Sequence, residues 1–168
     1  MNSRVYNSEK ELSQMGCAHI KLTETSKVLV GGLGMGYTLS EALRMVSTSS
    51  QVTVAELIPE VVEWNRGPLG NCANNPLDDP RTNLHMGDVR ELLTTHQPTF
   101  DAILLDIDNG TEGLTHSDNN WIYSLPGLQD IYSVLRPNGM LSIWSAGPYY
   151  LFTPRLHKSA YVVSTQIA

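Results

Sequence analysis

Short apolar runs alternate along this chain with longer segments whose apolar residues recur every three or four positions. The apolar runs predict buried strands, and the helical spacing predicts helices that cover them. We expect strands at residues 27–30, 51–56, 83–86, 100–105 and 140–144, and helices at 8–18, around 39–46, from 59 onward, around 89–93 and at 128–135. The tail adds a helix near 150–157 and a strand near 161–166. This alternation predicts an α/β fold with a mostly parallel sheet.

Four of the expected strands end in residues suited to ligand binding. The first runs into a glycine loop, and the others are followed by or end in acids: Gly31 to Gly36, Glu56, Asp88 and Asp106. In open α/β sheets ligands bind beyond the carboxyl ends of the strands, where the strand order reverses. A glycine loop alone is often only a tight turn, so the coincidence of the four features carries the prediction of a site.

The glycine loop reads Gly-x-Gly-x-Gly from Gly32 to Gly36, and Tyr37 stands where a dinucleotide fingerprint needs its third glycine. NAD is therefore disfavoured. Glu56 lies 20 residues after Gly36, the distance at which a carboxylate on the second strand accepts hydrogen bonds from ribose hydroxyls. Together, these two features predict a nucleoside ligand that has a ribose and lacks a pyrophosphate.

Two further acidic sites allow a functional and a structural interpretation. Asp88 either accepts from the exocyclic amine of adenine or simply caps the following helix. Asp106 and Asp108 open a polar stretch after the most apolar strand, at residues 107–120. They would hold a cationic ligand, and a carboxylate there would also serve as general base toward an amine. The structural alternative is a solvated turn at Asp108, Asn109 and Gly110.

Composition narrows the class of partner. The 168 residues carry a net charge of −6 and no run of Lys and Arg, which argues against a nucleic-acid groove or an anionic membrane. We expect a single domain over residues 1–168 that acts on a small molecule. Cys17 and Cys72 stand in no metal-binding spacing, so we expect no metal, while a disulfide between them stays open. No apolar stretch is long enough for a membrane span or signal peptide, which predicts a cytoplasmic protein.

Histidine and tryptophan residues are interpreted as structural. We expect His85 to be packed within its strand, and the other histidines lack metal-ligand spacing. Trp64, Trp121 and Trp144 are expected to pack in the core, with Trp121 also placed to flank the site because it follows the polar stretch.

The motifs taken in order resemble a known family. Four runs carry the resemblance: Val28 to Leu39 around the glycine loop, Val54 to Leu57, Gly87 to Val89, and Phe100 to Asp106. They are similar to the spermidine synthase-like branch of the class I S-adenosylmethionine-dependent methyltransferase superfamily, over about residues 8–144. The resemblance implies a Rossmann-like three-layer α/β/α sandwich with strand order 3-2-1-4-5-(7)-6, shortened at its C-terminal end. It also implies S-adenosylmethionine or its decarboxylated form as co-substrate, held by Gly31, Gly32, Leu33, Gly34, Gly36, Glu56, Leu57, Asp88 and Val89, with the reaction at Asp106 and Asp108.

The chain also departs from the polyamine synthases of that branch. Their acidic loop reads Asp-x-x-Asp, whereas here Asp106 is followed by Asp108 and then Asn109. The position of the second aspartate is therefore held by Asn109. The chain begins too late to include their N-terminal β-domain, so we expect a single methyltransferase-like domain without it.

Three functions follow as hypotheses. The first is a transferase that moves an aminopropyl or methyl group to a small amine-bearing acceptor. The second is a non-catalytic module that keeps the adenosyl site and forms a homodimer or serves a partner. The third, an NAD-dependent oxidoreductase, requires the glycine loop to tolerate Tyr37.

Overall fold

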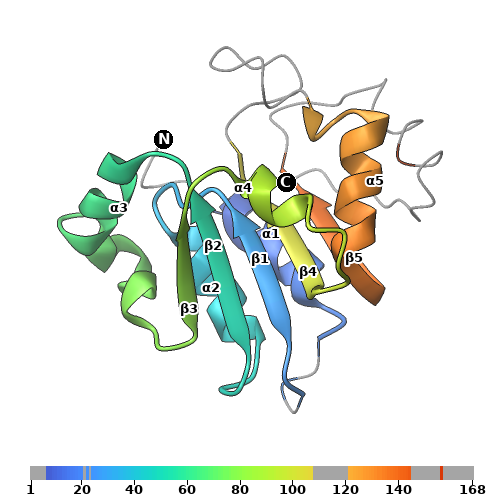
Figure 1. The fold of residues 1–168 in the computed structure, drawn as a ribbon. Coiled ribbons are helices and arrows are strands. Elements are labelled where there is room, and N and C mark those ends of the chain that lie inside the picture. Colours follow the sequence, from blue (N-terminus) through green and yellow to red (C-terminus); the bar gives the residue numbers. More distant parts are fainter. Residues whose placement is uncertain (1–6, 21, 23, 108–120, 145–155, 157–168) are drawn as a thin grey trace.

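One parallel sheet forms the centre of the molecule. The computed structural model describes residues 7–20, 22, 24–107, 121–144 and 156, and the sheet within them has the strand order β3-β2-β1-β4-β5 (Figure 1). Every neighbouring pair is parallel. The strands are β1 (Lys27–Gly31), β2 (Gln51–Glu56), β3 (Thr82–Met86), β4 (Phe100–Leu105) and β5 (Leu135–Ile143). The predicted Rossmann-like order 3-2-1-4-5 is confirmed, while the further strand expected near 161–166 lies outside the described residues.

Helices cover both faces of this sheet and make three layers (Figure 1). They are α1 (Asn7–Cys17), α2 (Tyr37–Met45), α3 (Pro59–Arg66), α4 (Val89–Leu93) and α5 (Leu125–Val134), with short 3-10 turns η1 (Gly70–Ala73) and η2 (Pro76–Asp78). Val28 and Val30 of β1 pack with α1, α2 and α3, whereas Leu29 between them packs with α4 and α5. Successive side chains of a strand point to opposite faces, so one short apolar run supplies both halves of the core.

Local sequence signals explain where several helices begin. Pro59 opens α3, where its missing N–H would have no helical partner. Asp88 caps α4, and its side chain accepts a hydrogen bond from the Arg90 N–H at 2.9 Å. Ser124 caps α5 by accepting from the Gly127 N–H at 3.2 Å. By contrast, α2 begins after Gly36 and α3 after Ile58 without a side-chain cap.

The region from α5 to β5 differs from the prediction. The sequence predicts a helix over 128–135 and a strand from Met140, which leaves Arg136 to Gly139 as a turn between them. Instead α5 begins at Leu125 because Ser124 caps it, and β5 begins at Leu135. The turn residues form an irregularity inside the strand: Phe100 pairs with Leu135 and Ala102 with Met140, and Asn138 is left-handed at φ 67°. A β-bulge of this kind absorbs extra residues without ending the strand pairing.

The strand order places a reversal between β1 and β4, which run side by side although β2 and β3 separate them in sequence. The carboxyl ends of both strands lie at the same edge, and the loop after β1 emerges there. Among the described residues no helix has the length and apolar character needed to cross a membrane. The helix and strand expected in the tail, residue 156 apart, lie outside the described part of the chain.

Candidate functional site

The glycine loop and the end of β4 meet through their backbones. The Asp106 N–H donates to the Gly31 carbonyl at 2.9 Å. Gly32 has φ 91°, and a Cβ on it would lie 2.4 Å from the Asp106 carbonyl oxygen. Only glycine adopts this conformation readily, and only glycine leaves room for such a close approach. The loop therefore lies directly against the strand that ends in the candidate catalytic aspartate.

Glu56 joins the same loop from β2. The residue is 7% exposed. Its Oε2 accepts a hydrogen bond from the Leu33 N–H at 2.9 Å, and its Oε1 accepts from the Ile58 N–H at 2.9 Å. A carboxylate has about four acceptor positions, so two hydrogen bonds leave capacity for ribose hydroxyls. Glu56 and Asp106, predicted from sequence to share one edge, both contact the glycine loop or the helix that follows it.

Asp106 is held by a residue that the sequence did not single out. The Thr38 hydroxyl, on the first turn of α2, donates to Asp106 Oδ2. The Thr38 backbone carbonyl in turn accepts from the Ser13 hydroxyl of α1 at 2.8 Å. Thr38 and Ser13 are both buried. The aspartate carboxylate is thereby fixed relative to the glycine loop by a short hydrogen-bonded chain from α1. Asp108 lies outside the described residues.

Asn65 of α3 is the second residue that sequence reasoning missed. It is 1% exposed, and its amide donates to the Gly34 carbonyl at 2.8 Å. Nothing in the local sequence predicted this contact, which agrees with the rule that buried amides are normally hydrogen-bonded. The loop is thus held at Leu33 by Glu56 and at Gly34 by Asn65.

The third strand end supports the structural interpretation of Asp88. Its Oδ1 caps α4 by accepting from Arg90. Val89 is buried against the loop, where a Cβ on Gly31 would lie 3.3 Å from Val89 Cγ2. Leu57, directly after Glu56, is 62% exposed. The edge next to Glu56 therefore offers apolar surface from Leu57, while Asp88 has a capping role whatever else it contacts.

Three expectations about aromatic, histidine and cysteine residues need correction or refinement. Trp64 is 53% exposed on α3, so the prediction that it packs in the core is wrong: α3 turns Val62 and Asn65 inward instead. Trp121 is partly buried and stacks under the Arg90 guanidinium, 4.7 Å from the ring centroid. His85 is only partly buried, with Nε2 3.1 Å from Glu91 Oε2. Cys17 is buried, Cys72 is exposed and both are free.

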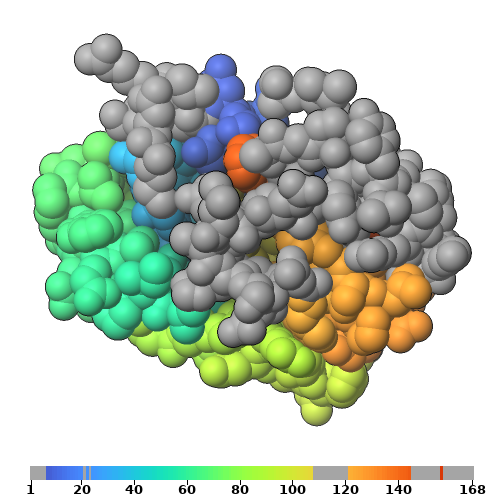
Figure 2. Space-filling view, turned by 90° about the horizontal axis from the view of Figure 1, so that it is seen from above, coloured from blue at the N-terminus to red at the C-terminus, as the bar shows by residue number. Residues whose placement is uncertain are grey.

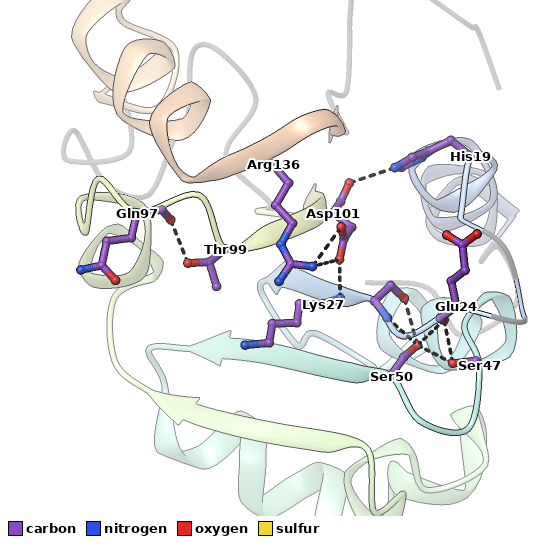
Figure 3. Close-up of polar contacts among 10 residues, drawn as sticks. His19, Glu24, Lys27, Ser47, Ser50, Gln97, Thr99, Asp101 and Arg136 are labelled. Carbon is purple, nitrogen blue, oxygen red and sulfur yellow. Dashed lines mark hydrogen bonds and ion pairs between the residues drawn. The ribbon is translucent and has the colours of Figure 1, made fainter.

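A small cleft of about 100 Å³ lies at the opposite, amino-terminal edge of the sheet, lined by residues that include His19, Glu24 and Asp101. Figure 3 shows Asp101 between the backbone of Lys27 and the side chain of Arg136. Its carboxylate accepts from the Lys27 N–H at 2.7 Å and from Arg136 Nη1 at 3.0 Å. These contacts join β1, β4 and β5 at their starts, so they stabilise the sheet at the edge away from the glycine loop.

The glycine loop emerges at the other edge. Figure 2 views the molecule from above this edge, with α3 in green shades on one side and α5 in orange on the other. Among the described residues there is no cluster of three His, Cys, Asp or Glu side chains that could hold a metal ion.

Curated proteins with similar sequences include polyamine aminopropyltransferases. A polyamine aminopropyltransferase of Sulfolobus acidocaldarius is 30% identical over 131 residues, covering 78% of this chain and 42% of that protein. One from Thermococcus onnurineus is 32% identical over 130 residues, covering 77% and 43%. The chain thus spans under half the length of these curated relatives.

Solved structures show the same fold. Spermidine synthase from Thermotoga maritima has a TM-score of 0.69 at 24% identity, covering 90% of this chain and 50% of that one. An O-methyltransferase from Bacillus cereus in complex with SAH has a TM-score of 0.55 at 20% identity, covering 82% and 55%. The sequence profile of the spermine/spermidine synthase domain matches residues 9–154. The chain therefore belongs to the spermine/spermidine synthase domain family.

Proposed function

We propose that this chain binds decarboxylated S-adenosylmethionine and transfers its aminopropyl group to a small amine. The observation that carries the proposal is the placement of Glu56 and Asp106 around one glycine loop, through Leu33 and Thr38 respectively. Membership of the spermine/spermidine synthase family supports it, as do relatives named polyamine aminopropyltransferases.

The residues present suit an adenosyl group. Glu56 has acceptor capacity beyond its two backbone hydrogen bonds, as ribose hydroxyls require. Leu57 offers an exposed apolar side chain beside it, against which adenine would pack. Asp88 uses Oδ1 as a helix cap, and in our proposal its second oxygen accepts from the adenine amine. The loop itself contacts the ligand through Gly31, Gly32, Leu33, Gly34 and Gly36, and Val89 packs against the loop at Gly31.

The chemistry needs one proton acceptor and good alignment. A sulfonium donor supplies an electrophilic methylene carbon and a neutral thioether leaving group. The acceptor nitrogen forms the new C–N bond as the C–S bond breaks, and the electron pair of that bond goes to sulfur. Because a protonated amine has no lone pair, Asp106 first takes its proton and also holds the amine in line. The Thr38 hydroxyl orients the carboxylate for this role. We assign Asp108 as a second anchor for the amine.

Methyl transfer from S-adenosylmethionine is the second candidate. It is favoured by the similarity of the fold to O-methyltransferases. Methyl transfer also requires fewer catalytic side chains, since alignment of donor and acceptor supplies much of the acceleration. A chain that binds adenosyl ligands without turnover would fit the same residues. The three alternatives differ in their products and can be separated by one set of assays.

The test combines binding and turnover. Calorimetry should show binding of 5′-methylthioadenosine and S-adenosylhomocysteine but not of NAD. Mass spectrometry of a reaction with decarboxylated S-adenosylmethionine and putrescine should then show an aminopropylated amine. Asp106→Asn should abolish product, whereas Asp101→Asn, the same change at the far end of β4, should leave turnover per folded molecule intact. Binding without product from any amine or methyl acceptor would favour the non-catalytic module. Binding of NAD alone would overturn the proposal.

A further inference from the structure

Asn65 has a hydrogen-bonding pattern that stability alone does not explain. Its Nδ2 donates to the Val61 carbonyl at 2.9 Å, within α3, and to the Gly34 carbonyl at 2.8 Å, 31 residues away in sequence. Its Oδ1 is buried and has no hydrogen-bond partner among the described residues. An unpaired buried acceptor is costly, because it has lost water and gained nothing in return.

The hydrogen bond to Gly34 fixes the orientation of a whole peptide unit. In a trans peptide the carbonyl and the following N–H lie in one plane and point in opposite directions. Since the Gly34 carbonyl points at Asn65 on α3, the Met35 N–H points away from α3. Gly34 is left-handed at φ 51°, and glycine adopts positive and negative φ about equally readily. Without a partner for its carbonyl, this peptide would be free to rotate.

The surroundings of Asn65 are closely packed around the loop. A Cβ on Gly36 would lie 3.0 Å from Asn65 Oδ1 and 3.0 Å from Pro76 Cγ. A Cβ on Gly70 would lie 2.3 Å from the Asn65 carbonyl oxygen. The segment after α3 therefore folds back over Asn65 and holds its side chain against the glycine loop.

We propose that Asn65 is a positioning residue for the adenosyl site: its amide fixes the Gly34–Met35 peptide so that the Met35 N–H is presented on the side of the loop away from α3, to a bound ligand. Glu56 acts on the same loop one peptide earlier, at Leu33. Both residues come from the β2–α3 unit, so this unit sets the shape of the loop from two points. The inference rests on the proposed adenosyl ligand for its functional meaning.

The experiment separates positioning from stability. Asn65→Leu keeps the side chain branched at Cγ with the same number of heavy atoms, removes the donor to Gly34 and removes the unpaired acceptor, so the fold should persist. Calorimetric titration with 5′-methylthioadenosine should show affinity lowered about tenfold, as expected for one hydrogen bond that orders the site. Ser50→Ala is the control: Ser50 is buried at the opposite edge, 2.8 Å from the Ser47 hydroxyl, and its loss should lower stability without lowering affinity.

Amide hydrogen exchange of a peptide spanning residues 33–37 gives a readout that needs no ligand. Exchange should be faster in Asn65→Leu than in the wild type and unchanged in Ser50→Ala. Wild-type affinity in a folded Asn65→Leu protein, or an equal loss in Ser50→Ala, would overturn the inference. If the wild type binds no adenosyl ligand, the proposed function fails separately, and unchanged exchange at 33–37 in Asn65→Leu would overturn the role of Asn65 in holding the loop.

Discussion

Glu56 and Leu33 are joined by a hydrogen bond of 2.9 Å between a side-chain carboxylate and a backbone N–H. This bond ties the end of β2 to the glycine loop after β1, and a second bond of 2.9 Å ties Glu56 to Ile58. The carboxylate that we propose to bind ribose therefore also builds the loop on which the ligand would lie. Ligand binding and local stability should consequently fall together when it is removed.

Replacing Glu56 by alanine should destabilise the fold measurably. The change leaves the N–H groups of Leu33 and Ile58 without their partner, and a buried donor without a partner costs about 1–3 kcal/mol. Urea unfolding followed by circular dichroism should show a loss of this size. Glu60→Ala, which removes an exposed carboxylate from α3, serves as control. A loss for Glu56→Ala within about 0.5 kcal/mol, the range of ordinary surface substitutions, would contradict the structure.

Much of this site could be predicted because parallel strands bring their carboxyl ends to one edge. Glu56 and Asp106 are 50 positions apart in the chain, yet their positions directly after apolar runs sufficed to bring them together. Asp88 could be interpreted as a cap from its place before Val89, and the structure confirms the cap. These predictions depend on strand position and local helix chemistry, both of which a sequence displays.

Other features depended on packing between distant segments. Asn65 lies in a stretch rich in Asn, Gly and Pro, and nothing in its neighbours indicates that α3 turns it toward Gly34. Thr38 is one hydroxyl residue among many in the chain, and its contact with Asp106 follows only from the way the start of α2 meets the end of β4 in three dimensions. The prediction that Trp64 packs in the core was wrong for the same reason, because hydrophobicity does not specify which face of a short helix is covered.

Gly32→Ala should disturb the junction between the loop and β4. The new methyl group would lie 2.4 Å from the Asp106 carbonyl oxygen, and alanine is strained at φ 91°. We expect a loss of about 2 kcal/mol or more in urea unfolding. Gly67→Ala is a milder glycine change, since its methyl would lie 3.3 Å from the Glu63 carbonyl oxygen at an exposed site. Equal stability of the two variants would show that the close approach is not as described.

Arg81 should stabilise the C-terminal end of α2 in a pH-dependent way. Its guanidinium binds Asp79 at 2.7 Å and donates to the Leu43 carbonyl at 2.8 Å. The hydrogen bond from Arg81 lowers the pKa of Asp79 below its usual value. A lowered folded-state pKa contributes stability that is complete above the unfolded pKa, about 3.9 for aspartate, and is lost as the pH falls through the folded value.

The measurement for this pair is urea unfolding at two pH values. Arg81→Met should lower stability at pH 7 by about 1–3 kcal/mol, because it removes a charge-assisted pair and leaves helix carbonyls without a donor. At pH 3 and below the difference should shrink as Asp79 becomes protonated, but the part due to the α2 carbonyls should remain. Arg66→Met, at an exposed arginine in the last turn of α3, should show neither effect. A difference that grows toward acid would contradict this assignment.

The two cysteines should react very differently. Cys17 is fully buried, and burial raises the pKa of its thiol to about 12, so almost no reactive thiolate forms at neutral pH. Cys72 is exposed. Mass spectrometry after brief treatment with a maleimide at pH 7 should show one label at Cys72 in the native protein and two after unfolding in guanidinium. Rapid native labelling of Cys17, or no labelling of either thiol without prior reduction, would contradict this arrangement.

Thr38 offers a test of how Asp106 is oriented. Thr38→Val preserves the shape of the buried side chain but removes the hydroxyl that donates to Asp106 Oδ2. Hydrogen bonds to charged groups contribute about 1.5–3 kcal/mol, so a carboxylate that has lost this donor should hold its proton more tightly and point less consistently at the acceptor amine. With decarboxylated S-adenosylmethionine and putrescine, kcat should fall about tenfold or more while the Kd for 5′-methylthioadenosine changes little. Thr38→Ser keeps the hydroxyl and should lose much less activity. If both variants lose kcat equally while remaining folded, packing at Thr38 matters rather than its hydrogen bond, and the role assigned to its hydroxyl would be wrong.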